Sequence, residues 1–405
     1  MKTKIILAAF IAACLLAACS GNDVDTPTVA KPNFTVEEIN TADQLADFGM
    51  EFFQTVCKDT PEGNVVMSPI GASIVLSMLA NTVDESTSNQ ISDVLGFSNV
   101  STANALFQKY MSWLPNADNN VQLYLSNSVW YNENYTLSPE FSAIAQQYYS
   151  SPAFARDFDQ NSTSTVNEIN RWVSSKTNGN INSILENLTP KNYFVMINAL
   201  NFKGNWSSPF DASKTNDESF YGYHGNHRVP MMKKEHSYSY TETNDFQIVE
   251  LPFGNRTFTT WVVLPSSKWN IDEFIGSDSF RSILHNPMVT CNVDLTFPKF
   301  KIEPQDKLDL REALSNMGIS NINKFQSLGL FLENVNTYLD IFQKTSIEFD
   351  ETGAKASSVS VATGGDIFTP PPSGRVEMIV NRPFVFIIKE STTKTPLFVG
   401  RVTNI

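Results

Sequence analysis

Residues 351–376 read ETGAKASSVSVATGGDIFTPPPSGRV, and the two halves of this stretch favour different backbone structures. In the first half, alternate positions carry only small side chains, at Ala354, Ala356, Ser358, Ser360 and Ala362. Because successive side chains of a strand point to opposite faces, this half can join a sheet with its small face against a crowded core. The second half contains Gly-Gly at 364–365 and three prolines at 370–372, which exclude it from a sheet interior. The stretch predicts a strand-competent segment joined to an exposed loop; an ordinary surface loop is the alternative.

The rest of the chain has the length and patterning of one large globular unit. Its 405 residues can bury a sizeable core. Residues 69–79 form an almost entirely apolar helical segment after Ser68, which predicts a central buried helix. Helical spacing dominates the early part of the chain, whereas strand-like runs dominate the later part, including 193–206, 292–303 and 378–388. This order predicts a single α+β domain with a large sheet.

The N-terminus has the features of an export signal. Residues 1–18 contain two lysines followed by an apolar run, and the signal ends in Leu-Ala-Ala immediately before Cys19. This ending resembles a bacterial lipobox, in which the cysteine becomes lipidated and is the first mature residue. We expect residues 19–40 to be a lipidated polar tether and 41–405 to be the folded domain, anchored at the outer membrane or cell surface. An ordinary signal peptide that ends in small residues is the alternative.

Charge and cysteine content narrow the range of partners and of covalent chemistry. The net charge is −13, and loss of Lys2 and Lys4 with the signal would lower it by two, to −15. Such an acidic chain repels phosphate backbones, so we expect no nucleic-acid partner. Cys57 and Cys291 are too few for a disulfide framework, and we expect buried thiols, with a single bridge as the alternative.

No pattern in the sequence favours catalysis. The four histidines at 224, 227, 236 and 285 are not accompanied by Cys or carboxylate residues at a metal-site spacing. Gly-x-Ser-x-Gly, phosphate-binding and dinucleotide-binding motifs are missing from the sequence. We therefore expect a protein that is not an enzyme and that needs neither a metal nor another cofactor.

Short motifs distributed along the chain resemble those of one family. They occur in a fixed order at 64–69, 172–179, 198–206, 229–232, 298–302, 381–384 and 398–402. Each motif is weak alone, but together they are specific, and the chain resembles a serpin over essentially all of 41–405. The resemblance implies helices packed on a large central mixed β-sheet, with two further sheets and an exposed reactive-centre loop. It also implies a monomer that inhibits proteases.

The resemblance identifies residues 351–376 as the hinge and reactive-centre loop. Inhibitory serpins offer this loop as bait, and the cleaved loop then inserts into the large sheet while the protease remains attached as an acyl-enzyme. The hinge residues implied here are Glu351, Gly353, Ala354, Ala356, Ser358, Ser360 and Ala362. The family's usual spacing puts the reactive bond between Ile367 and Phe368, to within one residue. From Glu351 the inserted segment would extend roughly 50 Å to this bond at about 3.3 Å per residue.

The side chains at the reactive bond suggest which proteases are targets. Ile367 fits the modest apolar pocket of elastase-like or subtilisin-like enzymes, whereas a shift to Phe368 would favour a chymotrypsin-like enzyme. Papain-like cysteine proteases are a further class of candidate targets. Arg375 would suit a trypsin, but it lies too near the next predicted strand.

The resemblance also identifies a sheet-opening cluster of Ser68, Asn198 and Gln343. The family usually has a second Ser where this chain has Gly71, and a His where it has Gln343. We expect Gln343 to bond both Asn198 and Ser68, although its amide does not titrate. These departures bear on the rate of sheet opening and leave two alternatives: a non-inhibitory serpin-fold binding module, or a decoy whose loop is simply cleaved.

Overall fold

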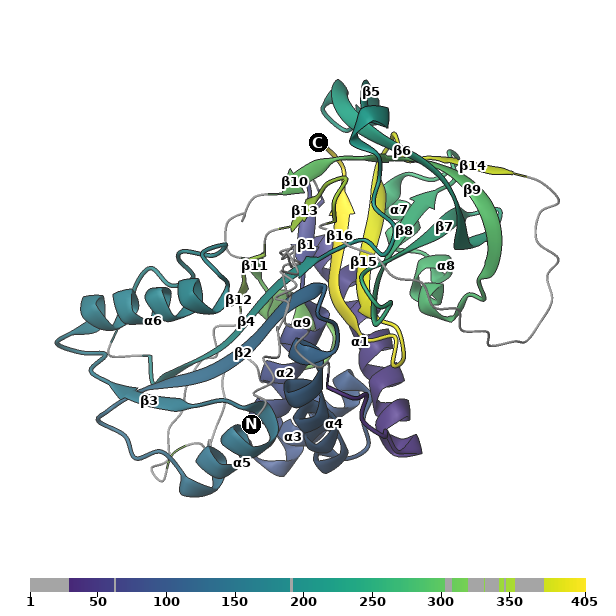
Figure 1. Cartoon of the computed structure of the whole chain (residues 1–405). Coiled ribbons are helices and arrows are strands. Elements are labelled where there is room, and N and C mark those ends of the chain that lie inside the picture. Colours follow the sequence, from purple (N-terminus) through teal and green to yellow (C-terminus); the bar gives the residue numbers. More distant parts are fainter. Residues whose placement is uncertain are drawn as a thin grey trace, which may run out of the picture.

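The computed structural model describes residues 29–61, 63–189, 192–302, 308–319, 331, 342–345, 347–353 and 375–405. The predicted signal, Cys19 and most of the predicted tether lie outside this part of the chain. Figure 1 shows helices α1–α5 gathered at one end of the molecule and strands β5–β9 with β14 at the other.

The described residues alternate between helices and strands early and are dominated by strands later. In chain order the elements are α1 (Val36–Asp59), β1 (Val65–Met67), α2 (Pro69–Ala80), α3 (Glu85–Leu95), α4 (Val100–Trp113), η1 (Leu114–Asn116), β2 (Val121–Asn132), α5 (Pro139–Tyr149), β3 (Ala153–Arg156), α6 (Ser162–Lys176), β4 (Phe194–Gly204), η2 (Ala212–Lys214), β5 (Asn216–Gly222), β6 (Gly225–Glu242), β7 (Phe246–Pro252), β8 (Phe258–Pro265), α7 (Ile271–Ile275), α8 (Asp278–Arg281), η3 (Ile283–His285), β9 (Val289–Pro298), β10 (Phe300–Ile302), β11 (Leu308–Asp309), α9 (Arg311–Asn316), β12 (Phe342–Gln343), β13 (Ile347–Phe349), β14 (Val376–Ile379), β15 (Phe384–Glu390) and β16 (Pro396–Val402).

Helix α1 begins at Val36, so the folded part of the chain starts before the predicted boundary at residue 41. The Thr35 side chain accepts a hydrogen bond from the amide of Glu38, and the Glu38 carboxylate accepts one from the amide of Thr35. This capping box satisfies two helix-end donors and sets the start of the helix. Residue 41, the predicted start of the domain, is Thr41, which is buried within α1.

Helix α2 is the buried central helix that the sequence predicts. Ser68 caps it by accepting a hydrogen bond from the Gly71 amide, Pro69 occupies the first helical position, and all twelve residues of the helix are buried. It contacts α1, α3, α4 and α5, together with β4 and β16. Burial on every side explains why its sequence shows no polar stripe.

Strands β3, β2 and β4 form a three-stranded mixed sheet between two layers of helices. Strand β2 pairs parallel to β3 and antiparallel to β4, with Asn127 opposite Asn198. Helix α6 covers one face through a core that includes Trp130 and Ile169, and α2 packs on the other side against β4 (Figure 1). The predicted strand at 193–206 is therefore present, but residues 201–204 at its C-terminal end are not buried.

The largest described sheet has the strand order β1-β16-β15-β8-β7-β6-β9-β14, with β5 paired to β6. The predicted strand at 378–388 is in fact two strands: β14 pairs parallel to β9, and β15 pairs antiparallel to β8 and β16. Pro383 lies between them and has no amide to continue a ladder. The predicted strand at 292–303 is likewise divided: the amide of Lys299 still donates to the carbonyl of Pro230 beside β6, the partner of β9, whereas β10 pairs with β13.

Two short ladders complete the described fold. Strand β10 pairs with β13, with Phe300 opposite Phe349, and β11 pairs with β12. Cys57 and Cys291 are free buried thiols, which confirms the prediction made for them. Within the described residues, every helix is too short or too polar to cross a membrane.

Candidate functional site

The predicted hinge begins with a tight turn immediately after β13. The Asp350 carboxylate accepts hydrogen bonds from the amides of Thr352 and Gly353, both at 2.9 Å, and from the Thr352 hydroxyl at 2.6 Å. Gly353 has a φ of +23°, and a Cβ there would lie 2.3 Å from Cδ1 of Trp206. The turn therefore requires glycine, because any side chain would collide with the indole ring.

Glu351 connects the hinge to three other segments. Its carboxylate accepts a hydrogen bond from the Thr215 hydroxyl at 2.9 Å and from the Lys299 ammonium at 2.8 Å. Its carbonyl accepts a hydrogen bond from the Phe210 amide at 2.9 Å. The Glu351 side chain is only 13% exposed, whereas that of Lys299 is 43% exposed, so the carboxylate is shielded from water but its ammonium partner is not.

The electrostatics of this contact favour the ionised carboxylate. Burial alone would raise the pKa of Glu351, but hydrogen bonds from Lys299, its own backbone and Thr215 outweigh that effect and hold the pKa below its usual value. The hydrogen bond to Glu351 in turn raises the pKa of Lys299 above its usual value. At neutral pH the hinge is therefore held by an ion pair.

Trp206 packs against the same turn. Its ring stacks on Phe253, with ring centres 4.5 Å apart, and lies nearly parallel to Phe349 at 5.9 Å. Its indole Nε1 donates to the carbonyl of Asp350 at 2.9 Å. Trp206 is buried and thus positions both the end of β13 and the first hinge residue.

A lysine on β6 holds the segment that follows Trp206. The ammonium of Lys234 donates to the carbonyl of Ser208 at 2.7 Å, to its hydroxyl at 2.5 Å and to the carbonyl of Pro209 at 2.7 Å. Burial lowers the pKa of Lys234 to about 8. Lys234 therefore positions Phe210, whose amide bonds Glu351.

The predicted sheet-opening cluster is only partly assembled as expected. The Ser68 amide donates to Oε1 of Gln343 at 2.9 Å, and Nε2 of Gln343 donates to the Ser68 carbonyl at 2.8 Å. One amide side chain thus satisfies both backbone groups of the α2 cap residue, as a neighbouring strand would. The expected bond between Gln343 and Ser68 is present.

The expected bond between Gln343 and Asn198 is not formed. In the described residues Nδ2 of Asn198 instead donates to Oδ1 of Asn127 on the adjacent strand at 2.8 Å. Gly71 explains why the three predicted residues still lie together: a Cβ there would lie 2.5 Å from Oδ1 of Asn198 and 3.2 Å from Nε2 of Gln343. Because Gly71 has no side chain, the side-chain amides of Asn198 and Gln343 can project into the space that a Cβ would occupy.

A cleft of about 750 Å³ separates β4 from β13. Its walls include residues 201–204 of β4, 347–349 of β13 and the 178–183 segment that follows α6, and Gly353 and Trp206 lie at its hinge end. In the described part of the chain, β4 pairs with β2 and β13 pairs with β10. The cleft thus lies between the edges of two strands, where an added strand would find backbone partners.

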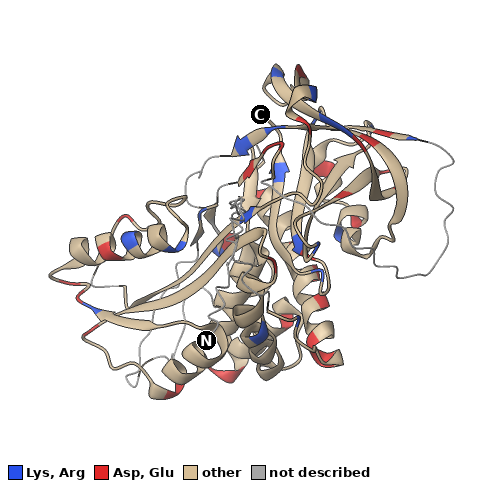
Figure 2. Ribbon diagram, in the orientation of Figure 1, with Lys and Arg blue, Asp and Glu red and all other residues tan. Residues whose placement is uncertain are grey.

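At the C-terminal end of the predicted loop, Arg375 forms a charged contact. Arg375 forms ion pairs with Asp294 and with Glu235, the latter at 3.4 Å. Figure 2 shows Lys and Arg interspersed with Asp and Glu over the described elements. The Arg375 guanidinium is therefore engaged in ion pairs immediately before β14, and Arg375 lies next to a strand, as the sequence predicts.

The remaining predicted site residues lie outside the described part of the chain. These are the hinge positions Ala354, Ala356, Ser358, Ser360 and Ala362 and the reactive bond between Ile367 and Phe368. Trp206, Thr215 and Lys234 were not predicted from the sequence. Trp206 is part of the 198–206 motif, but its contact with the hinge depends on residues more than 140 positions away.

Comparison with known proteins identifies the same family over most of the chain. Residues 43–405 match the family model described as Serpin (serine protease inhibitor). An uncharacterized serpin-like protein of Thermococcus kodakarensis is 32% identical over 284 residues, covering 69% of this chain and 65% of that protein. Plasminogen activator inhibitor 1 of Mus musculus is 29% identical over 395 residues, covering 92% of this chain and 95% of that protein.

A solved structure extends the similarity to three dimensions. The native state of Tengpin, a thermophilic serpin, superposes with a TM-score of 0.79 at 28% identity and covers 93% of this chain and 96% of its own. The predicted arrangement of helices on a mixed sheet with smaller sheets is thereby confirmed.

Replacing Glu351 by Gln should weaken the hinge. Gln retains a partner for Thr215 but loses the ion pair with Lys299, so we expect a loss of about 1 kcal/mol in the free energy of unfolding. Because folding lowers the pKa of Glu351, its contribution is complete above the unfolded value of 4.5 and is lost as the pH falls through the lower folded value. Urea unfolding from pH 3 to pH 7 would measure this; Glu348→Gln, three residues earlier at the exposed position of β13, is the matched control. Equal curves for the two variants would contradict the proposed role.

Replacing Gln343 by Leu tests the contact with the α2 cap. Leu has a similar size but leaves the amide of buried Ser68 without its partner, and leaves the Ser68 carbonyl with only the 3.3 Å bond from the Ala72 amide. We expect a loss of roughly 2–3 kcal/mol in the free energy of unfolding. Lys344→Gln, at the next position, should change the free energy of unfolding by less than about 1 kcal/mol. A Gln343→Leu protein as stable as the unmodified one would show that water or a local shift replaces these bonds.

Proposed function

Because the chain belongs to the serpin family, whose members are generally protease inhibitors, we propose that it inhibits serine endopeptidases by trapping them as acyl-enzymes. The observation that carries this proposal is the cleft between β4 and β13, which has the first hinge residues at one end. The segment that follows these residues has a face of small side chains, as a strand entering this cleft would need.

The chemistry begins on the protease. Its serine hydroxyl attacks the carbonyl carbon of Ile367, the bond to the amide nitrogen of Phe368 breaks, and that nitrogen takes up a proton as the new amino terminus. An ester now joins Ile367 to the protease. If the loop inserts before water hydrolyses the ester, the attached protease is carried along the sheet and its active site is distorted.

Insertion is driven by interactions that the native fold leaves unmade. A new strand between β4 and β13 would form two ladders of backbone hydrogen bonds and bury apolar surface. To move in as a continuation of β13, the hinge must rearrange at Gly353 and release contacts such as that of Trp206 with Asp350. The contacts of Glu351 and Trp206 therefore set part of the barrier to insertion.

The choice of protease depends on the side chain before the cleaved bond. With Ile367 in that place, elastase-like and subtilisin-like enzymes are the favoured targets, and a bond one residue later would favour chymotrypsin-like enzymes. Papain-like cysteine proteases would follow the same course through a thioester. A non-inhibitory binding module and a decoy that is only cleaved remain the alternatives.

The proposed place of action is the cell surface. Export by residues 1–18 and lipidation of Cys19 would hold the domain at the outer membrane through a polar tether, as a monomer whose only membrane contact is the lipid. Mass spectrometry of the N-terminal peptide of the exported protein would detect a lipidated Cys19, and an unmodified N-terminus would refute this proposal.

Incubation with elastase-, subtilisin-, chymotrypsin- and trypsin-like proteases tests the function. We expect a complex with at least one of the first three that survives a denaturing gel, together with a released peptide that begins at Phe368. Mass spectrometry of that peptide identifies the bond. Cleavage of the loop by every protease without loss of protease activity would instead indicate a decoy or a non-inhibitory member.

An Ala356→Arg variant separates insertion from cleavage. Arg at this small-face position would have to enter the core, so we expect the complex to fall at least tenfold while cleavage continues at a similar rate. Ser357→Arg, on the opposite face, is the control and should trap the protease nearly as well as the unmodified protein. Equal trapping by both variants would contradict the proposed orientation of the inserted strand.

A further inference from the structure

Three distant segments meet around a small hollow at the end of the molecule that carries β5. The segments are the β5–β6 turn, the connection between β8 and α7, and the connection between β14 and β15 (Figure 1). The hollow has a volume of about 210 Å³. The residues that line the hollow include Tyr221, Tyr223, Trp269, Asn270 and Arg382.

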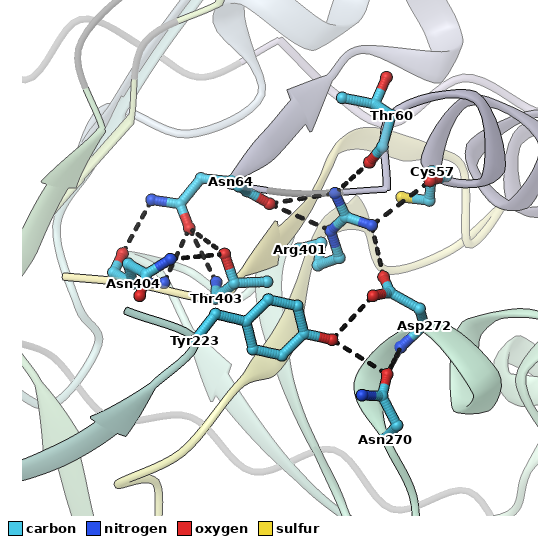
Figure 3. A network of polar contacts seen from close by, with 10 residues as sticks. Cys57, Thr60, Asn64, Tyr223, Asn270, Asp272, Arg401, Thr403 and Asn404 are labelled. Atoms are coloured by element: carbon cyan, nitrogen blue, oxygen red, sulfur yellow. Dashed lines mark hydrogen bonds and ion pairs between the residues drawn. The ribbon is translucent and has the colours of Figure 1, made fainter. Parts of the chain in front are cut away.

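Hydrogen bonds hold the wall formed by Tyr223 and Asn270 in place. Figure 3 shows the Tyr223 hydroxyl turned toward Asp272 and Asn270, to which it donates at 2.7 Å and 3.0 Å. Burial, and then the bond to Asp272, raise the pKa of Tyr223 to about 12, so the hydroxyl keeps its proton. The same Asp272 pairs at 2.5 Å with Arg401, which is fully buried. The wall is thus built into the core before any ligand arrives.

Trp269, on the aromatic side of the hollow, is also held in place by contacts with the core. The indole Nε1 of Trp269 donates to Asp245 at 3.1 Å, and its ring meets the buried ring of Phe274 edge-on. The backbone amide of Tyr221 donates to the carbonyl of Asn381 at 2.8 Å, whereas the Tyr221 side chain is 51% exposed. Tyr221 therefore presents a ring to solvent at a fixed point of the backbone.

Arg382 supplies a cation whose hydrogen-bonding capacity is largely unused. Within the described residues, its guanidinium makes one hydrogen bond, from Nη2 to the carbonyl of Pro265 at 2.8 Å. Burial lowers the pKa of Arg382, as expected for a cation partly removed from water without a carboxylate partner. The carboxylates nearby have other partners: Asp272 pairs with Arg401, and Asp245 pairs with Lys268.

We propose that this hollow binds a small carboxylate that carries a flat ring, such as an aromatic acid. Arg382 would hold the carboxylate through two parallel N–H donors, and the rings of Tyr221, Tyr223 and Trp269 would surround the flat body. A cationic ligand is disfavoured by Arg382, and a purely apolar one would leave the guanidinium desolvated without compensation. The site is separate from the hinge and does not depend on the inhibitory function.

The size of the hollow limits the ligand to a single ring. A volume of about 210 Å³ lies below the roughly 300–1,000 Å³ of sites for drug-sized ligands, which favours one ring with a short acidic substituent. A ligand of this size has few atoms with which to gain affinity. We therefore expect a dissociation constant between roughly 10 μM and 1 mM.

Ligand-observed saturation-transfer NMR with benzoate tests the proposal on the unmodified protein. We expect saturable binding of benzoate, at least tenfold weaker binding of benzamide, which keeps the ring but lacks the charge, and equally weak binding of acetate, which lacks the ring. Equal binding of benzoate and benzamide, or no saturable binding of benzoate at 10 mM, would overturn it.

Variants locate the binding site. Arg382→Gln should reduce benzoate affinity at least tenfold, and Arg382→Lys, which keeps the charge but loses the two-pronged geometry, should reduce it less. Tyr221→Ser should weaken binding several-fold without affecting the fold, because Tyr221 is half exposed. Tyr124→Ser, at another exposed tyrosine on β2, is the matched control and should bind as the unmodified protein does. Unchanged affinity in both Arg382→Gln and Tyr221→Ser would place benzoate elsewhere and refute the site.

Discussion

The carboxylate of Glu351 is the contact on which the arrangement of the candidate site depends. It connects the end of β13 to Thr215 before β5 and to Lys299 between β9 and β10, while its backbone carbonyl receives the Phe210 amide. None of these segments is adjacent to the hinge in the chain. A single ionised side chain, shielded from water, therefore joins the small sheets to the large one at the point where the loop begins. Because the carboxylate's own partners are the Thr215 hydroxyl and the Lys299 ammonium, the ion pair requires the charged form of the carboxyl group.

The sheet-opening cluster is held by a different kind of interaction. Gln343 and Ser68 exchange two hydrogen bonds between neutral groups, and neither group titrates in the physiological range. Acid would therefore weaken the hinge contact without changing this cluster directly. If the loop inserts between β4 and β13, the two sets of contacts would be separate barriers, one electrostatic and one made of neutral hydrogen bonds. The use of Gln in place of the family's usual His removes a titrating group from the second barrier.

The polar network around Arg401 stabilises the fold and also holds one wall of the proposed ligand site. Arg401 is fully buried and donates to the carbonyls of Cys57, Thr60 and Gly63 as well as to Asp272 (Figure 3). A buried guanidinium is tolerable only with such complete hydrogen bonding. By engaging Asp272, Arg401 also orients the acceptor of Tyr223. Arg382, only a short distance along the chain, lacks such a set of partners, and this contrast is the basis for assigning it a ligand.

Local patterns in the sequence were sufficient to predict the central helix, the main strands and the order of helices before strands. Ser68 and Pro69 mark a helix start, and a run of apolar residues identifies a buried element, because both signals act within a few residues. Ordered motifs were sufficient for the family. The strand break at Lys299, the pairing of Asn198 with Asn127, and the roles of Trp206 and Thr215 were decided by the tertiary structure. Each of these depends on which groups meet across more than 60 residues of chain, and no local pattern records which of several available donors and acceptors will be brought into contact.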